Sequence, residues 1–145
     1  MDSHNVIVRK ARFKDRFFMD ECNRRNLPEN YDILFWESHL CAHPYWSRVL
    51  ETTVIPQQIV GYILCDGETI ISLALDQSYR HSGWGTKLLC ELQTICPILN
   101  LQVRKTNRIA QSLYLKMGFR IAEELQDYYS DPKEDGILMT WTKPS

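Results

Sequence analysis

An apolar run that leads through a short polar turn into a glycine-containing helix start constrains the fold most. Residues 69–75 are almost continuously apolar, which is typical of a central strand buried on both faces. The turn then reads R-x-x-G-x-G over residues 80–85, and a helical repeat of apolar residues runs over residues 83–96. Residues 98–103 return to a strand-like pattern. This order predicts one strand–helix–strand unit between residues 69 and 103.

The start of that helix is a candidate anion site. The first N–H groups of a helix have no partner within it, and they lie at the positive end of the helix dipole. Glycines allow a phosphate to approach the backbone, so the turn suits a pyrophosphate. The residues alone leave open a second interpretation, a tight turn whose glycines serve packing only. The spacing matches neither a P-loop nor a dinucleotide-binding fingerprint.

The remaining segments predict further strands and helices around this unit. Asp66-Gly67 predicts a tight hairpin turn, and Gly118 predicts a left-handed cap after the last helix. Apolar residues at helical spacing predict the buried stripe of the central helix, namely Leu88, Leu89, Leu92 and Ile95. We expect the other strands at residues 6–11, 49–55, 58–65, 120–125 and 137–141, the other helices at residues 14–25, 31–41 and 107–117, and a polar loop at residues 130–136. The pattern predicts a mixed sheet with helices on its faces.

Composition disfavours several classes of function. The chain has 145 residues, 44% hydrophobic and 24% charged, so we expect one globular domain over residues 1–145. The chain has 17 Lys and Arg residues and 18 Asp and Glu residues, so its net charge is −1. We therefore expect no nucleic-acid partner. No apolar run approaches the ~20 residues of a membrane span, so we expect no membrane partner.

The cysteine pattern favours a reducing compartment. The chain has 5 cysteines and no C-x-x-C pair, which is unlike a disulfide framework. Cys65 and Cys90 lie in apolar segments and are expected to be core residues. We therefore expect the protein in the cytoplasm.

Strand, R-x-x-G-x-G and helix together resemble the coenzyme A signature of the GNAT acetyltransferases. Four further segments resemble catalytic subunits of A-type N-terminal acetyltransferases more specifically: L-P-E-N-Y at 27–31, S-L-A-L at 72–75, V-R-K-T-N at 103–107 and D-Y-Y at 127–129. The resemblance implies a single GNAT domain of the α/β class. Its mixed, mostly antiparallel sheet would have about seven strands, splay between the fourth and fifth strands, and be flanked by about four helices.

The same resemblance implies acetyl-CoA as co-substrate and no metal. The pantetheine arm would lie in the gap between the splayed strands, and the diphosphate would be held mostly by backbone N–H groups. The matching residues are Leu73, Leu75, Arg80, His81, Gly83, Gly85, Thr86 and Asn107.

Two residues match catalytic positions of the family. Tyr114 would protonate the departing thiolate, and Glu29 would act as general base or order a water chain. Asn107 and Tyr114 are two helical turns apart, so they share a face. The alternatives are a helix cap for Asn107, a half-buried aromatic for Tyr114 and a surface carboxylate for Glu29. Gln102 stands where relatives carry histidine or glutamate, and glutamine cannot take a proton in this pH range.

The implied reaction is direct attack by the free N-terminal amine of a protein or peptide on the thioester. At pH 7, deprotonation costs about 1.4 kcal/mol for an α-amine and roughly 4.6 kcal/mol for a lysine, which favours the N-terminus. The resemblance places Leu27, Pro28, Tyr31 and one or other of Tyr128 and Tyr129 at the peptide entrance, with packing aromatics as the alternative for the tyrosines.

Partners and alternative functions remain open at this point. The resemblance allows an auxiliary subunit or an association with the ribosome. The alternatives are an acetyltransferase for lysine or a small amine, and a GNAT module that binds CoA without turnover. Arg104, Lys105 and Arg108 form a basic cluster that could steer phosphates or an acidic peptide, or form a solvated helix start.

Overall fold

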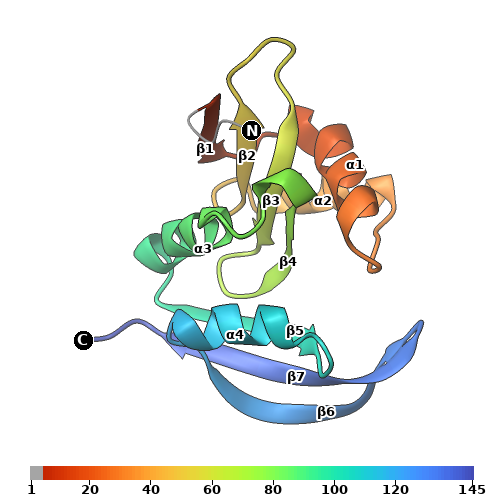
Figure 1. The fold of residues 1–145 in the computed structure, drawn as a ribbon, viewed down its shortest axis with the longest axis vertical. Coiled ribbons are helices and arrows are strands. Elements are labelled where there is room, and N and C mark those ends of the chain that lie inside the picture. The colour runs from red at the N-terminus through yellow and green to blue at the C-terminus, as the bar shows by residue number, and fades with distance from the viewer. Residues whose placement is uncertain (1–4) are drawn as a thin grey trace.

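The structure, a computed structural model, describes residues 5–145, and within this range seven strands form two antiparallel sheets (Figure 1). The first sheet has the order β1-β2-β3-β4 and the second the order β5-β7-β6. The strands are β1 (Val6–Lys10), β2 (Arg48–Thr52), β3 (Ile59–Cys65), β4 (Ile70–Leu75), β5 (Ile98–Arg104), β6 (Arg120–Ser130) and β7 (Lys133–Thr142). The α-helices are α1 (Arg16–Asn26), α2 (Ile33–Ala42), α3 (Trp84–Ile95) and α4 (Arg108–Lys116). The expected mixed α/β fold with a mostly antiparallel sheet is confirmed.

Strand β3 is the central buried strand of the first sheet. All seven of its residues are buried. Tyr62 and Leu64 pack into the core cluster formed with α1 and α2, whereas Ile63 and Cys65 pack into the cluster formed with α3. Figure 1 shows α1 and α2 on one side of this sheet and α3 on the other. A strand covered on both faces needs apolar residues at successive positions, as β3 has.

The expectation that residues 69–75 are buried on both faces is wrong. In β4, buried and partly exposed residues alternate, so that Ser72 and Ala74 are buried while Leu73 and Leu75 are not. Strand β4 is the last strand of its sheet, and its partly exposed Ile71 and Leu73 line a cavity. The apolar run at residues 69–75 therefore predicted the strand, but it could not show which face of the strand is exposed.

Strands β4 and β5 form a fork. They are joined by one isolated parallel bridge, between Thr69 and Asn100, and the N–H of Asn100 donates to the carbonyl of Glu68 over 2.8 Å. Beyond that bridge, β4 pairs only with β3 and β5 only with β7. The predicted strand–helix–strand unit is confirmed as β4, α3 and β5, and so is the splay between the fourth and fifth strands.

Two strand predictions needed correction at their ends. The hairpin of β6 and β7 is longer than expected, because Lys133 to Gly136, predicted as loop, pair with β6 and β5 as part of β7. Its turn is confined to Asp131 and Pro132. Conversely, β2 ends at Thr52 rather than at residue 55, since residues 53–56 form a bend that includes Pro56.

Helix α3 buries three of the four residues of its predicted stripe. Leu88, Leu89 and Leu92 are fully buried, but Ile95, in the last turn, is 39% exposed. Cys90, also expected in the core, lies on the exposed face of the helix, whereas Cys65 is buried as expected. Gly118 has a φ of +93° after α4, which confirms the left-handed cap. None of the helices within residues 5–145 is long and apolar enough to cross a membrane.

The contrast between Leu89 and Ile95 gives a test of this core. We expect Leu89→Ala to lower the free energy of unfolding by about 2–5 kcal/mol, because it leaves a cavity in a fully packed site. The matched control Ile95→Ala should cost less than about 1 kcal/mol, since a partly exposed side chain loses few contacts. Urea titration followed by circular dichroism measures both, and equal losses would contradict the assigned helix face.

Candidate active site

A cavity of about 790 Å³ opens at the fork. Its walls come from both sheets, from the segment after α1 and from the tip of the β6–β7 hairpin. The lining comprises residues 27–31, 69–73, 101–104 and 128–131, together with Asn107, Ala110 and Tyr114 of α4 and its cap. The cavity thus brings together nine predicted site residues: Leu27, Pro28, Glu29, Tyr31, Leu73, Asn107, Tyr114, Tyr128 and Tyr129. Gln102 lines it as well.

The other predicted cofactor residues lie outside this cavity, around the turn from β4 into α3. They are Leu75, Arg80, His81, Gly83, Gly85 and Thr86. His81 and Gly83 have φ values of +62° and +86°, so the turn is left-handed at two positions. A Cβ added to Gly83 would meet no atom within 4 Å, which leaves its backbone open to a ligand. The left-handed turn and the start of α3 suit a diphosphate, and the fork between β4 and β5 suits an arm that contains amides. The residues present therefore fit acetyl-CoA.

Tyr114 reaches the cavity from the face of α4 that packs against the core. Its ring lies 5.6 Å from the ring of Phe119, and only 7% of the residue is exposed. Burial raises the pKa of Tyr114 to about 12, so the hydroxyl stays protonated at neutral pH. Burial is the one cause of this shift, and no hydrogen bond or charge among the described residues contributes to it. A protonated hydroxyl at a cavity wall can donate to a reacting atom.

Asn107 caps α4 and lines the cavity at the same time. Its Oδ1 accepts from the N–H of Ala110 over 3.1 Å, as an N-cap side chain does. The cap interpretation is therefore confirmed. The cap is compatible with the prediction that Asn107 and Tyr114 lie on the same face of α4, because both line the same cavity.

Glu29 is held by Arg104 at the mouth of the cavity. The Nε of Arg104 donates to the Glu29 carboxylate over 2.9 Å. The Nη1 of Arg104 bonds Glu134 over 3.2 Å and the carbonyl of Pro132 over 2.9 Å, and its guanidinium lies 4.3 Å from the centre of the Tyr129 ring. Arg104 is therefore not a free cation of a steering cluster but the bridge between two walls. The sequence contained one signal for it, the V-R-K-T-N segment on β5.

A buried polar chain fixes the main chain next to Glu29. Asn23 is fully buried, and its Nδ2 donates to the carbonyl of Glu29 and to the hydroxyl of Tyr62, each over 3.0 Å. Tyr62 in turn bonds the Oγ of Ser72 over 2.7 Å, and Asn30 donates to Asn23 over 2.8 Å. Burial raises the pKa of Tyr62, so this hydroxyl remains neutral. No role for Asn23 or Tyr62 follows from the sequence pattern, because the bond that joins them links positions 39 apart along the chain.

The aromatic residues of the mouth pack and line the cavity at once. Tyr31 stacks on Phe35 at 4.7 Å, and its hydroxyl donates to the carbonyl of Ile71 over 3.4 Å. Tyr128 and Tyr129 meet edge to face at 4.9 Å, with Tyr128 50% exposed. Burial raises the pKa of both Tyr31 and Tyr129. Neutral rings around a cleft form an apolar wall that suits a peptide chain.

Comparisons with known proteins agree with this geometry. A family model described as an acetyltransferase (GNAT) domain matches residues 36–121. The catalytic subunit NAA10 of the N-terminal acetyltransferase A complex of Arabidopsis thaliana is 32% identical over 89% of this chain and 74% of its own length. An N-alpha-acetyltransferase of Sulfurisphaera tokodaii is 32% identical over 91% of this chain and 90% of its own.

Solved structures share the fold. The Ard1 protein of Thermoplasma volcanium superimposes with a TM-score of 0.83 at 24% identity, covering 97% of this chain and 99% of its own. A chain of the NatC complex bound to Gag peptide and CoA gives a TM-score of 0.85 at 20% identity, covering 95% and 98%. Family model, relatives and fold agree, and the chain belongs to the GNAT acetyltransferase family.

Proposed function

We propose that this acetyltransferase moves the acetyl group of acetyl-CoA to the free α-amino group at the N-terminus of a protein or peptide. The observation that carries the proposal is the cavity, which runs from the fork to Tyr114 and is walled at its mouth by residues 27–31 and 128–131. A donor entering along the fork and a peptide entering past the mouth would meet at Tyr114. The names of the relatives, N-alpha-acetyltransferase among them, support the choice of acceptor.

The two ends of acetyl-CoA would be held by different parts of the chain. Beyond Thr69, the edge of β4 that borders the fork has no partner strand within the described residues. The main-chain groups of Leu73 on this edge would bond the pantetheine amides. Leu75 contributes less as an acceptor, because its carbonyl already receives the Nε of Arg80 over 2.9 Å. The turn at His81 and Gly83 with the first N–H groups of α3 would hold the diphosphate.

In the proposed step, the amine nitrogen forms a bond to the acetyl carbon and the bond from that carbon to sulfur breaks. The amine loses one proton, and the sulfur leaves as a thiolate that takes one up. Main-chain N–H groups at the fork would polarise the thioester carbonyl. No enzyme-bound acyl intermediate is needed, and no cysteine lines the cavity.

Tyr114 would serve the leaving sulfur as a hydrogen-bond donor. With the pKa of Tyr114 at about 12, full proton transfer to a thiolate of ordinary basicity is uphill by roughly 5 kcal/mol. Burial in the same cavity also raises the pKa of the thiol, which reduces this difference. Donation begins as charge develops on sulfur, and transfer follows as the sulfur departs.

Glu29 would orient the attacking amine or a water beside it. A carboxylate paired with a guanidinium remains a hydrogen-bond acceptor. An α-amine at pH 7 needs only about 1.4 kcal/mol to lose its proton, so a weak base with good geometry is sufficient. Gln102 can bond a water there but cannot take its proton.

The proposal extends to compartment and partner. All five cysteines lie in the described residues and are free, which supports a reducing compartment such as the cytoplasm. Because two relatives are named as catalytic subunits of an N-terminal acetyltransferase A complex, we include an auxiliary subunit as a partner.

An acceptor panel tests the activity. The chain is incubated with acetyl-CoA and peptides that have a free N-terminus, a blocked N-terminus, or a blocked N-terminus and an internal lysine, and with a polyamine. We expect CoA release and acetylated product with free N-termini only. Product from blocked lysine peptides or from the polyamine would contradict the acceptor class, and CoA binding without product from any acceptor would contradict catalysis.

Two variants test the assigned roles. We expect Tyr114→Phe to lower kcat on the order of 10²-fold, because the leaving sulfur loses its donor, with the Kd of acetyl-CoA nearly unchanged. We expect Glu29→Gln to lower kcat/KM for the peptide by about tenfold. Steady-state rates and calorimetric titration give these values. Tyr45→Phe and Glu21→Gln, at exposed positions away from the cavity, are the matched controls. An unchanged kcat in Tyr114→Phe would contradict the first role, and an unchanged kcat/KM for the peptide in Glu29→Gln would contradict the second.

Burial of Tyr114 also predicts a pH dependence of stability. The unfolded chain loses this proton near pH 10, and the folded chain keeps it to about pH 12. The stability that the buried, protonated Tyr114 contributes is therefore fully present below about pH 10. It is lost as the pH rises toward about 12, and the free energy of unfolding then falls by up to about 1.4 kcal/mol per pH unit. Denaturant unfolding between about pH 9 and 12 should give a shallower fall for Tyr114→Phe than for the native chain. Parallel curves would contradict the assigned burial.

A further inference from the structure

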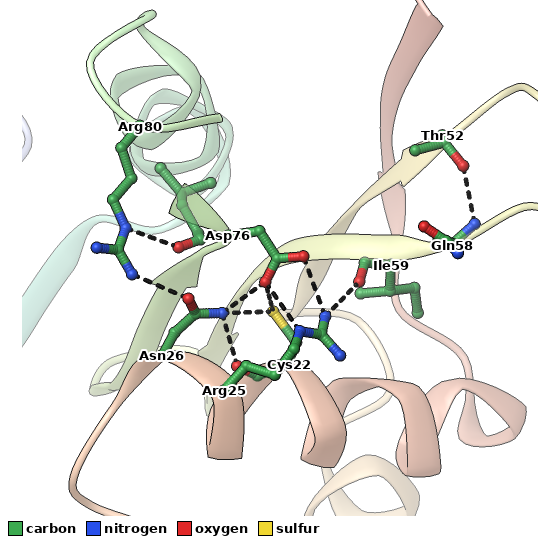
Figure 2. A network of polar contacts seen from close by, with 9 residues as sticks. Cys22, Arg25, Asn26, Thr52, Gln58, Ile59, Asp76 and Arg80 are labelled. Atoms are coloured by element: carbon green, nitrogen blue, oxygen red, sulfur yellow. Dashed lines mark hydrogen bonds and ion pairs between the residues drawn. The ribbon is translucent and has the colours of Figure 1, made fainter. Parts of the chain in front are cut away.

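A polar network joins the end of helix α1 to the turn that precedes α3 (Figure 2). Asp76 directly follows β4, and its carboxylate accepts from both Nε and Nη2 of Arg25 over 3.1 Å. The same carboxylate accepts from the Nδ2 of Asn26 over 2.7 Å. The Oδ1 of Asn26 accepts from the Nη2 of Arg80 over 2.9 Å. Asn26 is thus the link between Asp76 and Arg80.

The side-chain amide of Asn26 is suited to this link because it carries a donor and an acceptor in one group. Its Nδ2 faces two oxygen acceptors, the Asp76 carboxylate and the carbonyl of Cys22 at 2.8 Å, and the Cys22 sulfur at 3.6 Å, while its Oδ1 faces a guanidinium. The opposite orientation would set oxygen against a carboxylate. Burial raises the pKa of Cys22 beside it to about 12, so the neighbouring thiol adds no charge to the network.

The Arg80 guanidinium donates two hydrogen bonds to other parts of the protein. Its Nε donates to the carbonyl of Leu75, and its Nη2 donates to Asn26. Arg80 is also the residue at which the left-handed turn through His81 and Gly83 begins. The guanidinium therefore fastens the start of this turn to β4 and α1.

We propose that Asn26 is a positioning residue for the diphosphate end of acetyl-CoA, acting through Arg80 on the turn that carries the N–H groups. The inference rests on the proposed function, since it takes the turn at residues 80–86 as the diphosphate site. In this arrangement the Arg80 side chain holds the turn in place, and the backbone binds the phosphates. A preformed turn spares the ligand the cost of ordering it.

The test compares Asn26→Leu with the native chain. We expect the Kd of CoA, measured by calorimetry, to rise about tenfold, while kcat at saturating acetyl-CoA and KM for the peptide stay within about twofold. General loosening of α1 would instead raise KM for the peptide, because residues 27–31 follow this helix directly and line the cavity. Thr52→Val is the matched control: Thr52 Oγ1 accepts one hydrogen bond from Gln58 at 2.8 Å, separate from this network in Figure 2.

A charge exchange keeps the proposal testable if Asn26→Leu folds poorly. Asn26→Asp sets two carboxylates against each other and should weaken CoA binding. Adding Asp76→Asn removes this repulsion and leaves a carboxylate for Arg80. The oxygen that faces the Cys22 carbonyl still lacks a donor, and Arg25 loses its carboxylate partner, so CoA affinity should recover in part and exceed that of Asn26→Asp alone. Thermal melting accompanies each variant.

The outcomes separate the two proposals. Unchanged CoA affinity in Asn26→Leu, an equal rise in peptide KM, or no recovery in the double variant would overturn the positioning role. A chain that binds CoA through this network but acetylates no acceptor would overturn the proposed function and leave the positioning role standing. A native chain that binds no CoA would overturn both.

Discussion

The site depends on the point at which β4 and β5 stop pairing. One bridge at Thr69 and Asn100 joins them, and each strand then satisfies only one edge, β4 against β3 and β5 against β7. An unpaired main-chain group that is buried without a partner costs about 1–3 kcal/mol. The open edges must therefore be left to water or to a ligand that carries donors and acceptors of its own. A pantetheine arm with two amides is such a ligand.

The mouth of the cavity is held by ion pairs as well as by packed aromatic rings. Arg104 is only 12% exposed at its side chain, and it is balanced by Glu29 and Glu134 together with main-chain carbonyls of the hairpin turn. A nearly buried guanidinium without these partners would be strongly destabilising. The hairpin tip and the segment after α1 are thereby held opposite one another. This is why the Tyr128–Tyr129 pair faces the Leu27–Tyr31 segment although about 100 residues separate them.

The sequence indicated those features that local chemistry decides. Gly83 permits the left-handed backbone of the turn, and the leucines of α3 repeat with helical spacing. The turn and the helix could therefore be predicted from residues that are neighbours along the chain. The length of the β6–β7 hairpin did not, because residues 133–136 look like a polar loop until they pair across the sheet. The open face of β4 and the exposure of Cys90 likewise depend on what packs against each face. Arg104 and Asn26 acquire their roles from partners 75 and 54 positions away, which no local pattern reveals.

The end of α1 is anchored to both sides of the fork. Asn23 bonds Tyr62 of the first sheet, and Asn26 bonds Asp76, which directly follows β4. Glu29, three residues after Asn26, bonds Arg104 of the second sheet. Among residues 5–145, the bridge between Thr69 and Asn100 is the one β-bridge that joins the two sheets. The short segment of residues 23–29 is therefore held by polar contacts to both sheets, while the apolar core packs behind it. Apart from the buried Asn23–Tyr62 bond, these contacts lie at partly exposed positions, so each can be altered by one substitution without emptying the core. Within this segment, Asn26 contacts the turn before α3 and Glu29 contacts the second sheet, so the two contacts can be removed separately.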